Sequence, residues 1–396
     1  MNLPSFFHKP SADLDFLDCR EYYLPIRVPI LLESMLCDAD LSEKDRADLK
    51  TFTEMLEERF HYDYHKPLRE LKNDFVPFDP DHDTIREWQF TESELEEKRI
   101  RIYRSIRQLL QFGNYTELLP EQLAECLKLQ PIGGLSVHVD TTEFDEFHVY
   151  YRGTRVKTET ERFLFLWEQV RHVTIFNRVF VLARFKKEYG GRLVVKIFKE
   201  VPVENIKIIA PKVKLGMPIF DQLKIGGTVF SSLATTLYKL FVAVTLSWVL
   251  FAIVLGGLLI AASKGIFSFL GSKTKYMQRF SSSLYYRSLS NNRAAIIALI
   301  DAAEEQETKE TLLAYFVLFK HCDTGLTLEE INREVESWIE KEFSLRFRFE
   351  VDDAVRKLRE KNIIQLEDQL YRVFDLPETL RRLDETWDGL RSCQSS

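Results

Sequence analysis

One uncharged stretch constrains this chain more than any other feature of its sequence. From Leu240 to Ala262 it reads LFVAVTLSWVLFAIVLGGLLIAA, and about 20 apolar residues are enough for a helix to cross a bilayer. The low-charge zone extends over residues 225–271, with two lysines inside. Two arrangements stay open, a single spanning helix and a helical hairpin. The membrane-spanning positions that we predict are Leu240, Phe241, Trp248, Leu255, Gly256, Gly257 and Ala262.

Charges on the two sides of this stretch predict an orientation. Basic residues gather after it, and basic flanks favour the cytoplasmic side; they are Lys264, Lys273, Lys275 and Arg279. The start of the sequence lacks the pattern of a cleaved signal peptide. We therefore favour the hairpin, integral to a membrane, with both flanking parts on the cytoplasmic or matrix-like face.

Composition limits the class of protein. A chain of 396 residues has room for two or three folded units beside that stretch. Its formal net charge of -7 argues against a general binder of nucleic acid, because phosphate contacts need concentrated lysine and arginine. The cysteines have the spacing of neither a disulfide framework nor a zinc site, which fits a reducing compartment; they are Cys19, Cys37, Cys126, Cys322 and Cys393.

The sequence before the apolar stretch divides into a helical and a β-rich part. We predict an N-terminal helical region over residues 1–130, with one helix capped by Ser42 and running through Phe60. A second helix begins at the capping box of Thr91 and Glu94. Residues 131–215 are rich in β-branched and aromatic residues between glycine-containing turns, which predicts a β-rich domain.

The sequence after the apolar stretch predicts a winged-helix-like domain over residues 284–375 and a C-terminal tail over 376–396. Helical patterns follow Ser290 and the capping box of Thr327, a third lies in VDDAVRKLREKN, and IIQL with LYRVF predicts a hairpin. The expected fold class is therefore α+β and membrane-anchored, with a transmembrane helix or helical hairpin between the β-rich middle domain and the winged-helix-like domain.

Several segments resemble the family that includes transmembrane protein 143, catalogued as domain of unknown function 3754. The likeness rests on YLPIRVPILLESML, LKNDFVPFDPD, EFHVYYRGT, VKIFKEVPVENIKIIAP, SLYYRSLSNN and AAEEQETKETLLAYFVL. It implies a membrane protein of a kind found in bacteria, chloroplast-bearing lineages and animal mitochondria. It implies no activity.

Two groups near the N-terminus have the residue types of metal ligands. His61 and His65 are four residues apart and so share a helix face, but HYDYH lacks the HExxH pattern and a third ligand, and we interpret them as surface or interfacial histidines. FDPDHDT begins like a calcium loop and then lacks its glycine and its closing glutamate, so a Pro-Asp turn is the better interpretation. We expect no metal and no cofactor.

Other candidates lie in the segments of the family resemblance. Glu304 and Glu305 belong to a run with Glu307, Lys309 and Glu310 that offers paired carboxylates, although a solvated helix face explains the run equally well. The remaining candidates for function are aromatic, basic or amide residues: Tyr151, Arg152, Tyr285, Tyr286, Asn291 and Asn292.

The third helix of the winged-helix-like domain carries the basic residues that a DNA reader would use. They are Arg356, Lys357, Arg359 and Lys361, but acidic neighbours dilute them, and nucleic acid is the less favoured partner. The motifs GxSxG, GxGxxG and GxxxxGK are absent.

Three functions stay open. We favour a membrane-anchored interaction or regulatory protein without evident catalysis, whose partners are the lipid bilayer and a protein or a second copy of the chain. The alternatives are a membrane-surface enzyme acting on lipid or a small molecule, and a membrane-tethered winged-helix DNA-binding protein.

Overall fold

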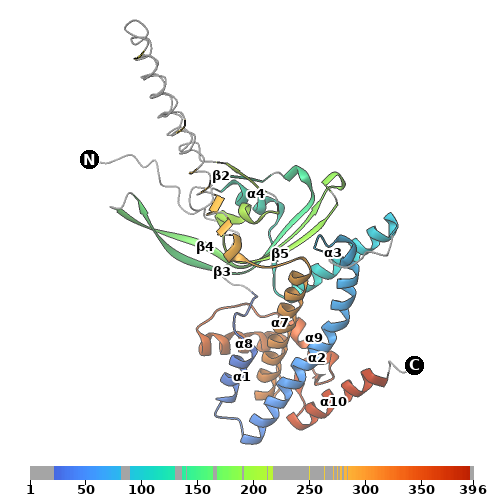
Figure 1. Ribbon diagram of the computed structural model, residues 1–396. Helices are drawn as coiled ribbons and strands as arrows, with labels where there is room; N and C mark the ends of the chain where they lie inside the picture. Colours follow the sequence, from blue (N-terminus) through green and yellow to red (C-terminus); the bar gives the residue numbers. More distant parts are fainter. Residues whose placement is uncertain are drawn as a thin grey trace.

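A layer of helices lies against one face of a twisted antiparallel sheet (Figure 1). The computed structural model describes residues 22–81, 90–129, 136–139, 141–163, 167–189, 191–211, 213–216 and 284–392, with a few single positions between 249 and 282. Helices from both ends of the sequence share the helical layer, and the sheet comes from its middle. The fold is therefore α+β with a helical N-terminal part and a central sheet. This confirms the predicted N-terminal helical region and the predicted β-rich middle part.

The N-terminal helices begin where the caps predict. These helices are α1 (Val28–Leu36), α2 (Glu43–Phe75) and α3 (Glu92–Phe112). The Ser42 hydroxyl accepts from the Asp45 N–H at 3.1 Å, and Thr91 and Glu94 cap α3 in the same reciprocal way. The predicted end of this helix at Phe60 is wrong. The helix α2 continues through Pro67 to Phe75.

The main sheet has the order β1-β3-β4-β5-β7, with every neighbouring pair antiparallel. Its strands are β1 (Thr116–Glu117), β3 (Phe144–Phe163), β4 (Trp167–Phe185), β5 (Leu193–Pro202) and β7 (Ser288–Asn291). The short strands β2 (Ser136–Val139) and β6 (Val213–Gly216) pair separately, and α4 (Pro120–Lys128) and the 3-10 segment Val203–Ile209 cover one face. The β-rich middle part is confirmed.

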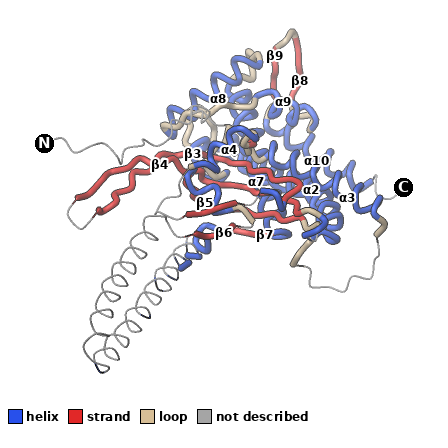
Figure 2. Tube along the Cα trace, turned by 90° about the horizontal axis from the view of Figure 1, so that it is seen from above, coloured by secondary structure: helices blue, strands red, loops and turns tan. Residues whose placement is uncertain are grey.

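The hairpin of β3 and β4 is longer than the rest of the sheet. Its pairing continues to Phe163 and Trp167, whereas β5 pairs with β4 only as far as Ile175. The outer part of the hairpin therefore projects as a two-stranded ribbon (Figure 2). We call residues 156–163 and 167–174 the β-ribbon.

The strand β7 leads into α7 (Asn292–Lys320), the central helix of the layer. Then follow α8 (Leu328–Phe343), α9 (Val351–Glu360), β8 (Ile364–Glu367), β9 (Leu370–Val373) and α10 (Leu376–Ser392). The three helices and the hairpin occur in the predicted order. α7 packs against α2, α3 and α9, and a single hydrophobic core joins Leu24 to Leu383. Helices far apart in sequence therefore share one interior.

The membrane-anchored fold class requires correction. Among the described residues, no helix is both long and apolar enough to cross a bilayer. The predicted segment 225–271, with Leu240, Phe241, Trp248, Leu255, Gly256, Gly257 and Ala262, lies outside the described residues. The long described helices α2 and α7 carry charged residues along their length, which is incompatible with a span. The fold class that the structure supports is α+β, with a helical N-terminal part and a sheet in the middle.

Candidate functional site

The middle of α7 carries polar residues inside the protein. Six consecutive side chains are each no more than 3% exposed: Gln306, Glu307, Thr308, Lys309, Glu310 and Thr311. Burial of a polar or charged group is costly unless it finds partners. We call residues 301–311 the polar band. The solvated helix face that the sequence suggested is wrong for Glu307, Lys309 and Glu310, whereas Glu304 and Glu305 are half-buried beside solvent. The partners of the band define the candidate site.

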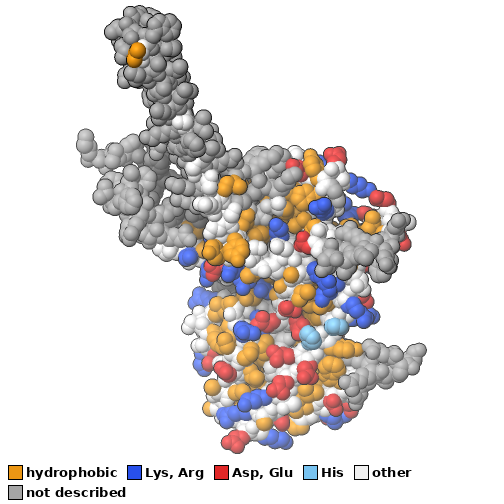
Figure 3. Space-filling model, in the orientation of Figure 1, with side chains coloured by type: hydrophobic (Ala, Val, Ile, Leu, Met, Phe, Trp, Pro, Cys, Tyr) orange, Lys and Arg blue, Asp and Glu red, His pale blue; other side chains and the backbone are white. Residues whose placement is uncertain are grey.

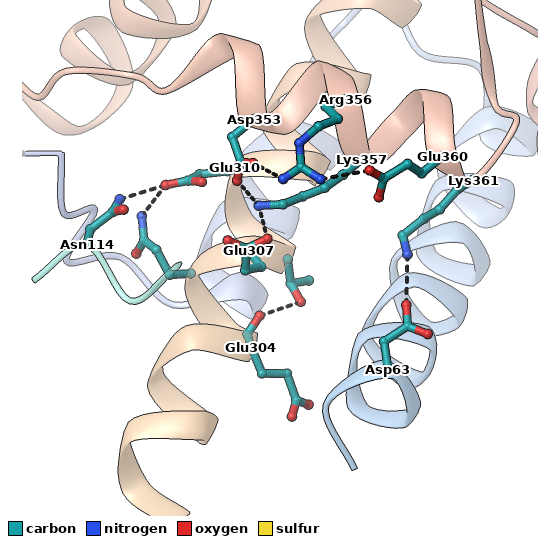
Figure 4. Close-up of polar contacts among 12 residues, drawn as sticks. Asp63, Asn114, Glu304, Glu307, Glu310, Asp353, Arg356, Lys357, Glu360 and Lys361 are labelled. Atoms are coloured by element: carbon teal, nitrogen blue, oxygen red, sulfur yellow. Dashed lines mark hydrogen bonds and ion pairs between the residues drawn. The ribbon is translucent and has the colours of Figure 1, made fainter. Parts of the chain in front are cut away.

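On one side of the polar band, carboxylates meet a buried lysine from α9. Glu307 and Asp353 both form ion pairs with the Lys357 ammonium, as Figure 4 shows. Oxygen atoms of Glu307, Glu310 and Asp353 all lie within 4.8 Å of one another. The Glu310 carboxyl accepts from Asn114 Nδ2 at 2.7 Å. We call this cluster the buried ion-pair network.

The carboxylates of this network contact cations of the protein directly, although Arg356 is shared with Glu360 and burial lowers the pKa of Lys357 to about 7. Burial raises the pKa of Glu310 to about 8, so this carboxyl holds its proton at neutral pH. Glu307 and Asp353 then face two cations, since Arg356 also pairs with Asp353. The three clustered carboxylates resemble a metal ligand set, but the Lys357 ammonium already supplies the positive charge there. The arrangement fits a structural network better than a metal centre.

A second side of the polar band faces the junction with the sheet. Lys309 donates to the Leu24 carbonyl at 2.9 Å and lies over the Tyr23 ring at 5.4 Å. Burial lowers the pKa of Lys309 to about 8. The guanidinium of Arg152 lies 4.3 Å from the same ring and donates to the Gly113 carbonyl. The predicted candidate Arg152 therefore joins the sheet to the helices.

The third side of the polar band is open to solvent and forms a cleft between α2 and α7. Its volume is about 650 Å³, and its lining includes five carboxylates and two imidazoles. The lining residues are Glu57, Glu58, His61, Tyr62, His65, Asp301, Glu304, Glu305, Thr308 and Trp387. Figure 3 shows histidine side chains close to acidic ones on the helical part. We call this the histidine–carboxylate cleft.

Helical spacing places these groups. His61 and His65 are one turn apart on α2, and Asp301, Glu304 and Glu305 follow the same three- and four-residue rule on α7. The two helices meet where His61 Nδ1 lies 3.2 Å from a Glu304 carboxylate oxygen. Residues 243 positions apart in sequence thus become neighbours.

Aromatic residues close one end of the cleft and tie α10 to α2. The Tyr62 and Trp387 rings meet edge to face with centroids 5.3 Å apart. The Arg59 guanidinium lies 5.8 Å from the Trp387 ring centroid and donates to the Thr386 carbonyl. These contacts position Trp387 as a wall of the cleft.

The cleft has an excess of negative charge. Burial raises the pKa of Glu57, and the charges of Glu304 and Glu305 across the cleft raise it further. Burial also raises the pKa of Asp301 and of Glu304, and His61 acts in the opposite direction on both. Among the described residues, no lysine or arginine lines the cleft. A positive ligand would relieve this repulsion.

Several other predicted candidates have structural surroundings. Tyr151 is buried in the second core, with its ring 4.4 Å from that of Phe176. Asn292 is buried at φ 47°, where its Oδ1 accepts from the Val195 N–H at 3.2 Å and its Nδ2 donates to Asp81. In the segment FDPDHDT, Asp81 therefore accepts a hydrogen bond from the Asn292 side chain, which also holds the backbone of β5. Asp83 of the same segment lies outside the described residues.

The candidates before α7 lie at the surface. Tyr285 and Tyr286 are 78% and 69% exposed and contact each other edge to face at 5.5 Å. Asn291 ends β7, opposite Lys196 of β5, and is exposed. The structure does not bring these three residues to the cleft or to the buried ion-pair network.

Two of the four basic residues predicted for the third helix are buried, and Arg356 and Arg359 are exposed. Lys357 and Lys361 are 5% and 7% exposed, and Lys361 pairs with Asp63 of α2 at 3.2 Å. Arg356 is held by Asp353 and Glu360 of its own helix. A recognition helix offers such side chains to phosphates and bases, so this arrangement does not favour DNA readout.

Comparison with known proteins gives a family match for part of the chain. Residues 144–294 match the family model described as protein of unknown function (DUF3754). This confirms the resemblance to domain of unknown function 3754 over the sheet and the first residues of α7, and the narrower likeness to the transmembrane protein 143 group is not confirmed. No solved structure matches the chain. The chain thus contains a domain of unknown function, and the cleft lies beyond the matched residues.

Proposed function

We propose that this is a regulatory binding protein that takes up a divalent transition-metal cation in the histidine–carboxylate cleft. The observation that carries the proposal is that His61 and His65 from α2 line one cleft with Asp301, Glu304 and Glu305 from α7. Among the described residues only Glu307, Glu310 and Asp353 have three ligand-type groups within 4.8 Å of one another, so a cation in the cleft would have to draw its side chains together. Imidazole and carboxylate together are ligands that suit zinc, manganese and iron. The sequence analysis singled out the two histidines and, separately, the two glutamates. Neither pair alone has enough ligands for a metal site.

The contact between His61 and Glu304 supports a metal role. In protein metal sites a ligating histidine commonly uses one ring nitrogen for the metal and the other for a carboxylate. Here Nδ1 of His61 is the nitrogen that meets Glu304, which leaves Nε2 for a ligand. Two imidazoles one helical turn apart, with carboxylates opposite, then supply the ligand types of a mixed nitrogen and oxygen site.

The position of the cleft suggests regulation rather than catalysis. Its ligand-type residues come from α2 and α7, and a cation held there would join two helices of one core. The only hydroxyl from serine or threonine in the lining is that of Thr308, which already donates to the Glu304 carbonyl at 2.9 Å. Binding that stabilises one arrangement of helices is the simplest basis for a metal-responsive protein.

Calorimetric titration of the full chain with Zn²⁺ and Mn²⁺, combined with visible absorption of bound Co²⁺, tests the proposal. We expect one bound ion and a loss of affinity of roughly tenfold or more in His61→Gln and in His65→Gln. His172→Gln is the matched control, because His172 is exposed on β4 and contacts Thr158 instead. Equal affinity in all three variants, or no binding by the unmodified chain, would refute the proposal.

A second function, self-association, is favoured by the β-ribbon. Two-stranded antiparallel ribbons are only marginally stable alone, and unpaired strand edges readily accept another strand. Among the described residues, neither ribbon edge has a further strand beside it between Val156 and Phe163 or between Trp167 and Thr174. Edge pairing with a second copy about a two-fold axis satisfies one edge of each ribbon. Analytical ultracentrifugation of a Val156→Pro variant should then show monomer where the unmodified chain shows dimer.

A further inference from the structure

A second cleft has the opposite charge and lies at the junction of the sheet with the helical layer. Its volume is about 810 Å³, and residues of α3 and β3 line it. They are Arg99, Ile100, Tyr103, Arg104, Arg107, Gln108, Gln111, Phe112, Glu146 and His148. Three guanidinium groups face one carboxylate there. We call it the arginine cleft.

Only part of this positive charge is used within the protein. Arg99 pairs with Glu96 and with Glu146, so its guanidinium is held in place. Arg104 and Arg107 are both exposed, and within the described part of the chain neither forms an ion pair with a carboxylate. The cleft therefore keeps two guanidinium groups without an anionic partner.

The spacing of the polar residues on α3 places them on one face of the helix. Arg104 and Arg107 are three residues apart, and Gln108 and Gln111 follow each of them by four, so all four side chains share a face of the helix. Guanidinium groups pair with phosphate through two parallel hydrogen bonds, and carboxamide N–H groups add further donors. The donors of this face match the acceptor oxygens of a phosphate group.

The opposite wall comes from β3 and is already ordered. Glu117 binds Nδ1 of His148 at 2.9 Å, which turns the other ring nitrogen away from that carboxylate. The His148 and Tyr103 rings meet edge to face with centroids 6.4 Å apart. The strand therefore adds an imidazole to the donors from α3, and α3 itself supplies the rings of Tyr103 and the half-buried Phe112.

We propose that the arginine cleft binds an organic phosphate, through the guanidinium groups of Arg104 and Arg107. The cleft is several times larger than a phosphate ion needs and lies in the range of pockets that hold small organic ligands. Its aromatic side chains give the organic part of such a ligand an apolar contact. This site is separate from the histidine–carboxylate cleft and does not depend on a metal there.

Equilibrium binding of three probes to the full chain tests the proposal: inorganic phosphate, adenosine triphosphate, and lipid vesicles with and without phosphatidic acid. We expect the nucleotide to bind more tightly than inorganic phosphate if the source is a soluble metabolite, and only the phosphatidic acid vesicles to bind if it is a lipid head group. Absence of binding for all three probes would overturn the proposal.

Substitutions locate the binding. Arg104→Gln and Arg107→Gln should each weaken binding by roughly tenfold to a hundredfold, and the double variant should weaken it further. Arg359→Gln is the matched control, because Arg359 is an exposed arginine of α9 outside the cleft, and it should bind as the unmodified chain does. A double variant with unchanged affinity, or an equal loss in the control, would overturn the assignment.

A charge-preserving pair separates paired hydrogen bonding from simple attraction. Arg104→Lys with Arg107→Lys keeps both positive charges but removes the planar fork of donors. We expect this variant to bind less tightly than the unmodified chain and more tightly than the double glutamine variant. Since both side chains are exposed, circular dichroism should show the same fold in every variant. Full affinity in the lysine variant would contradict the role assigned to the guanidinium groups.

Discussion

Replacement of Glu310 by glutamine should stabilise this protein at neutral pH. Glu310 is 2% exposed, and burial raises its pKa from the ordinary value of 4.5 to about 8. In the unfolded chain the carboxyl is ionised at pH 7, so folding must add a proton to it. Glutamine has the shape of the protonated side chain and needs no proton.

The expected size follows from proton linkage. Because the folded pKa is the higher one, the stability that Glu310 contributes is fully present below its unfolded pKa and is lost as pH rises toward 8. One pKa unit corresponds to about 1.4 kcal/mol, so about 3 kcal/mol is lost by pH 7. Glu310→Gln removes this loss and should therefore gain close to that amount.

The surroundings of Glu310 accept the exchange. Its Oε1 accepts from Asn114 Nδ2 at 2.7 Å and from Gln306 Nε2 at 2.9 Å, and a glutamine oxygen accepts both bonds. The new amide N–H group can donate toward the nearby carboxylates of Glu307 and Asp353. Neither donor is left without an acceptor, so the gain is not offset by an unsatisfied polar group.

Urea unfolding, followed by circular dichroism at about pH 4, 6, 7 and 8, measures the effect. The difference between Glu310→Gln and the unmodified chain should be near zero at the lowest pH and grow steadily above about pH 5. Glu329→Gln is the control, because Glu329 is exposed in the first turn of α8. A difference that does not change with pH, or a variant less stable at pH 7, would refute the reasoning.

Three further substitutions test other parts of the structure by the same unfolding measurement. Lys357→Ala should cost about 3 kcal/mol or more, because it leaves buried carboxylates without their cation, and a cost below about 1 kcal/mol would contradict the network. Gly153→Ala should cost about 1–3 kcal/mol, since φ is +74° and the new Cβ would lie 2.5 Å from Asn177 Nδ2; Gly191→Ala, also at positive φ but with open space, should cost less. Glu57→Gln should stabilise the metal-free protein by a few tenths of a kcal/mol through reduced repulsion, and destabilisation would argue against the charge excess.

Local signals in the sequence predicted much of this fold. The capping boxes at Ser42, Thr91 and Thr327 act within three residues, and each begins a helix where predicted. The hairpin strands have β-branched and aromatic residues in alternation, which a sheet with one buried face requires. These features need no knowledge of distant contacts, and they were read correctly for that reason.

Features that depend on tertiary contacts were misread. The helix capped by Ser42 was predicted to run through Phe60, yet α2 continues to Phe75 and passes through Pro67, since packing against α7 outweighs the hydrogen bond that proline removes. We expected Lys309 on a solvated helix face, where Glu305 is one turn away. In the structure Lys309 is buried and lies over the Tyr23 ring. The sequence alone does not show whether a charged side chain in a helix is exposed to solvent or is buried beside a partner.

The cleft was partly visible in the sequence. His61 and His65 were recognised as ligand-type residues that lack a third ligand, and Glu304 and Glu305 separately as paired carboxylates that a solvated helix face explains equally well. The signal that could have joined them is the equal spacing of ligand-type residues on two helices, because such stripes can face each other. Only the fold establishes that α2 and α7 are neighbours.

Metal binding in the cleft must compete with protons. A metal ion needs deprotonated ligands, and burial raises the pKa of Glu57, Asp301 and Glu304, so part of the binding free energy is spent on releasing protons. Affinity for Zn²⁺ should therefore rise as pH increases through the range in which these carboxyls ionise. Titration calorimetry in buffers of different ionisation enthalpy counts the protons released, and Glu57→Gln should release fewer. Affinity that is independent of pH would mean that these groups do not hold the ion, whatever else the protein binds.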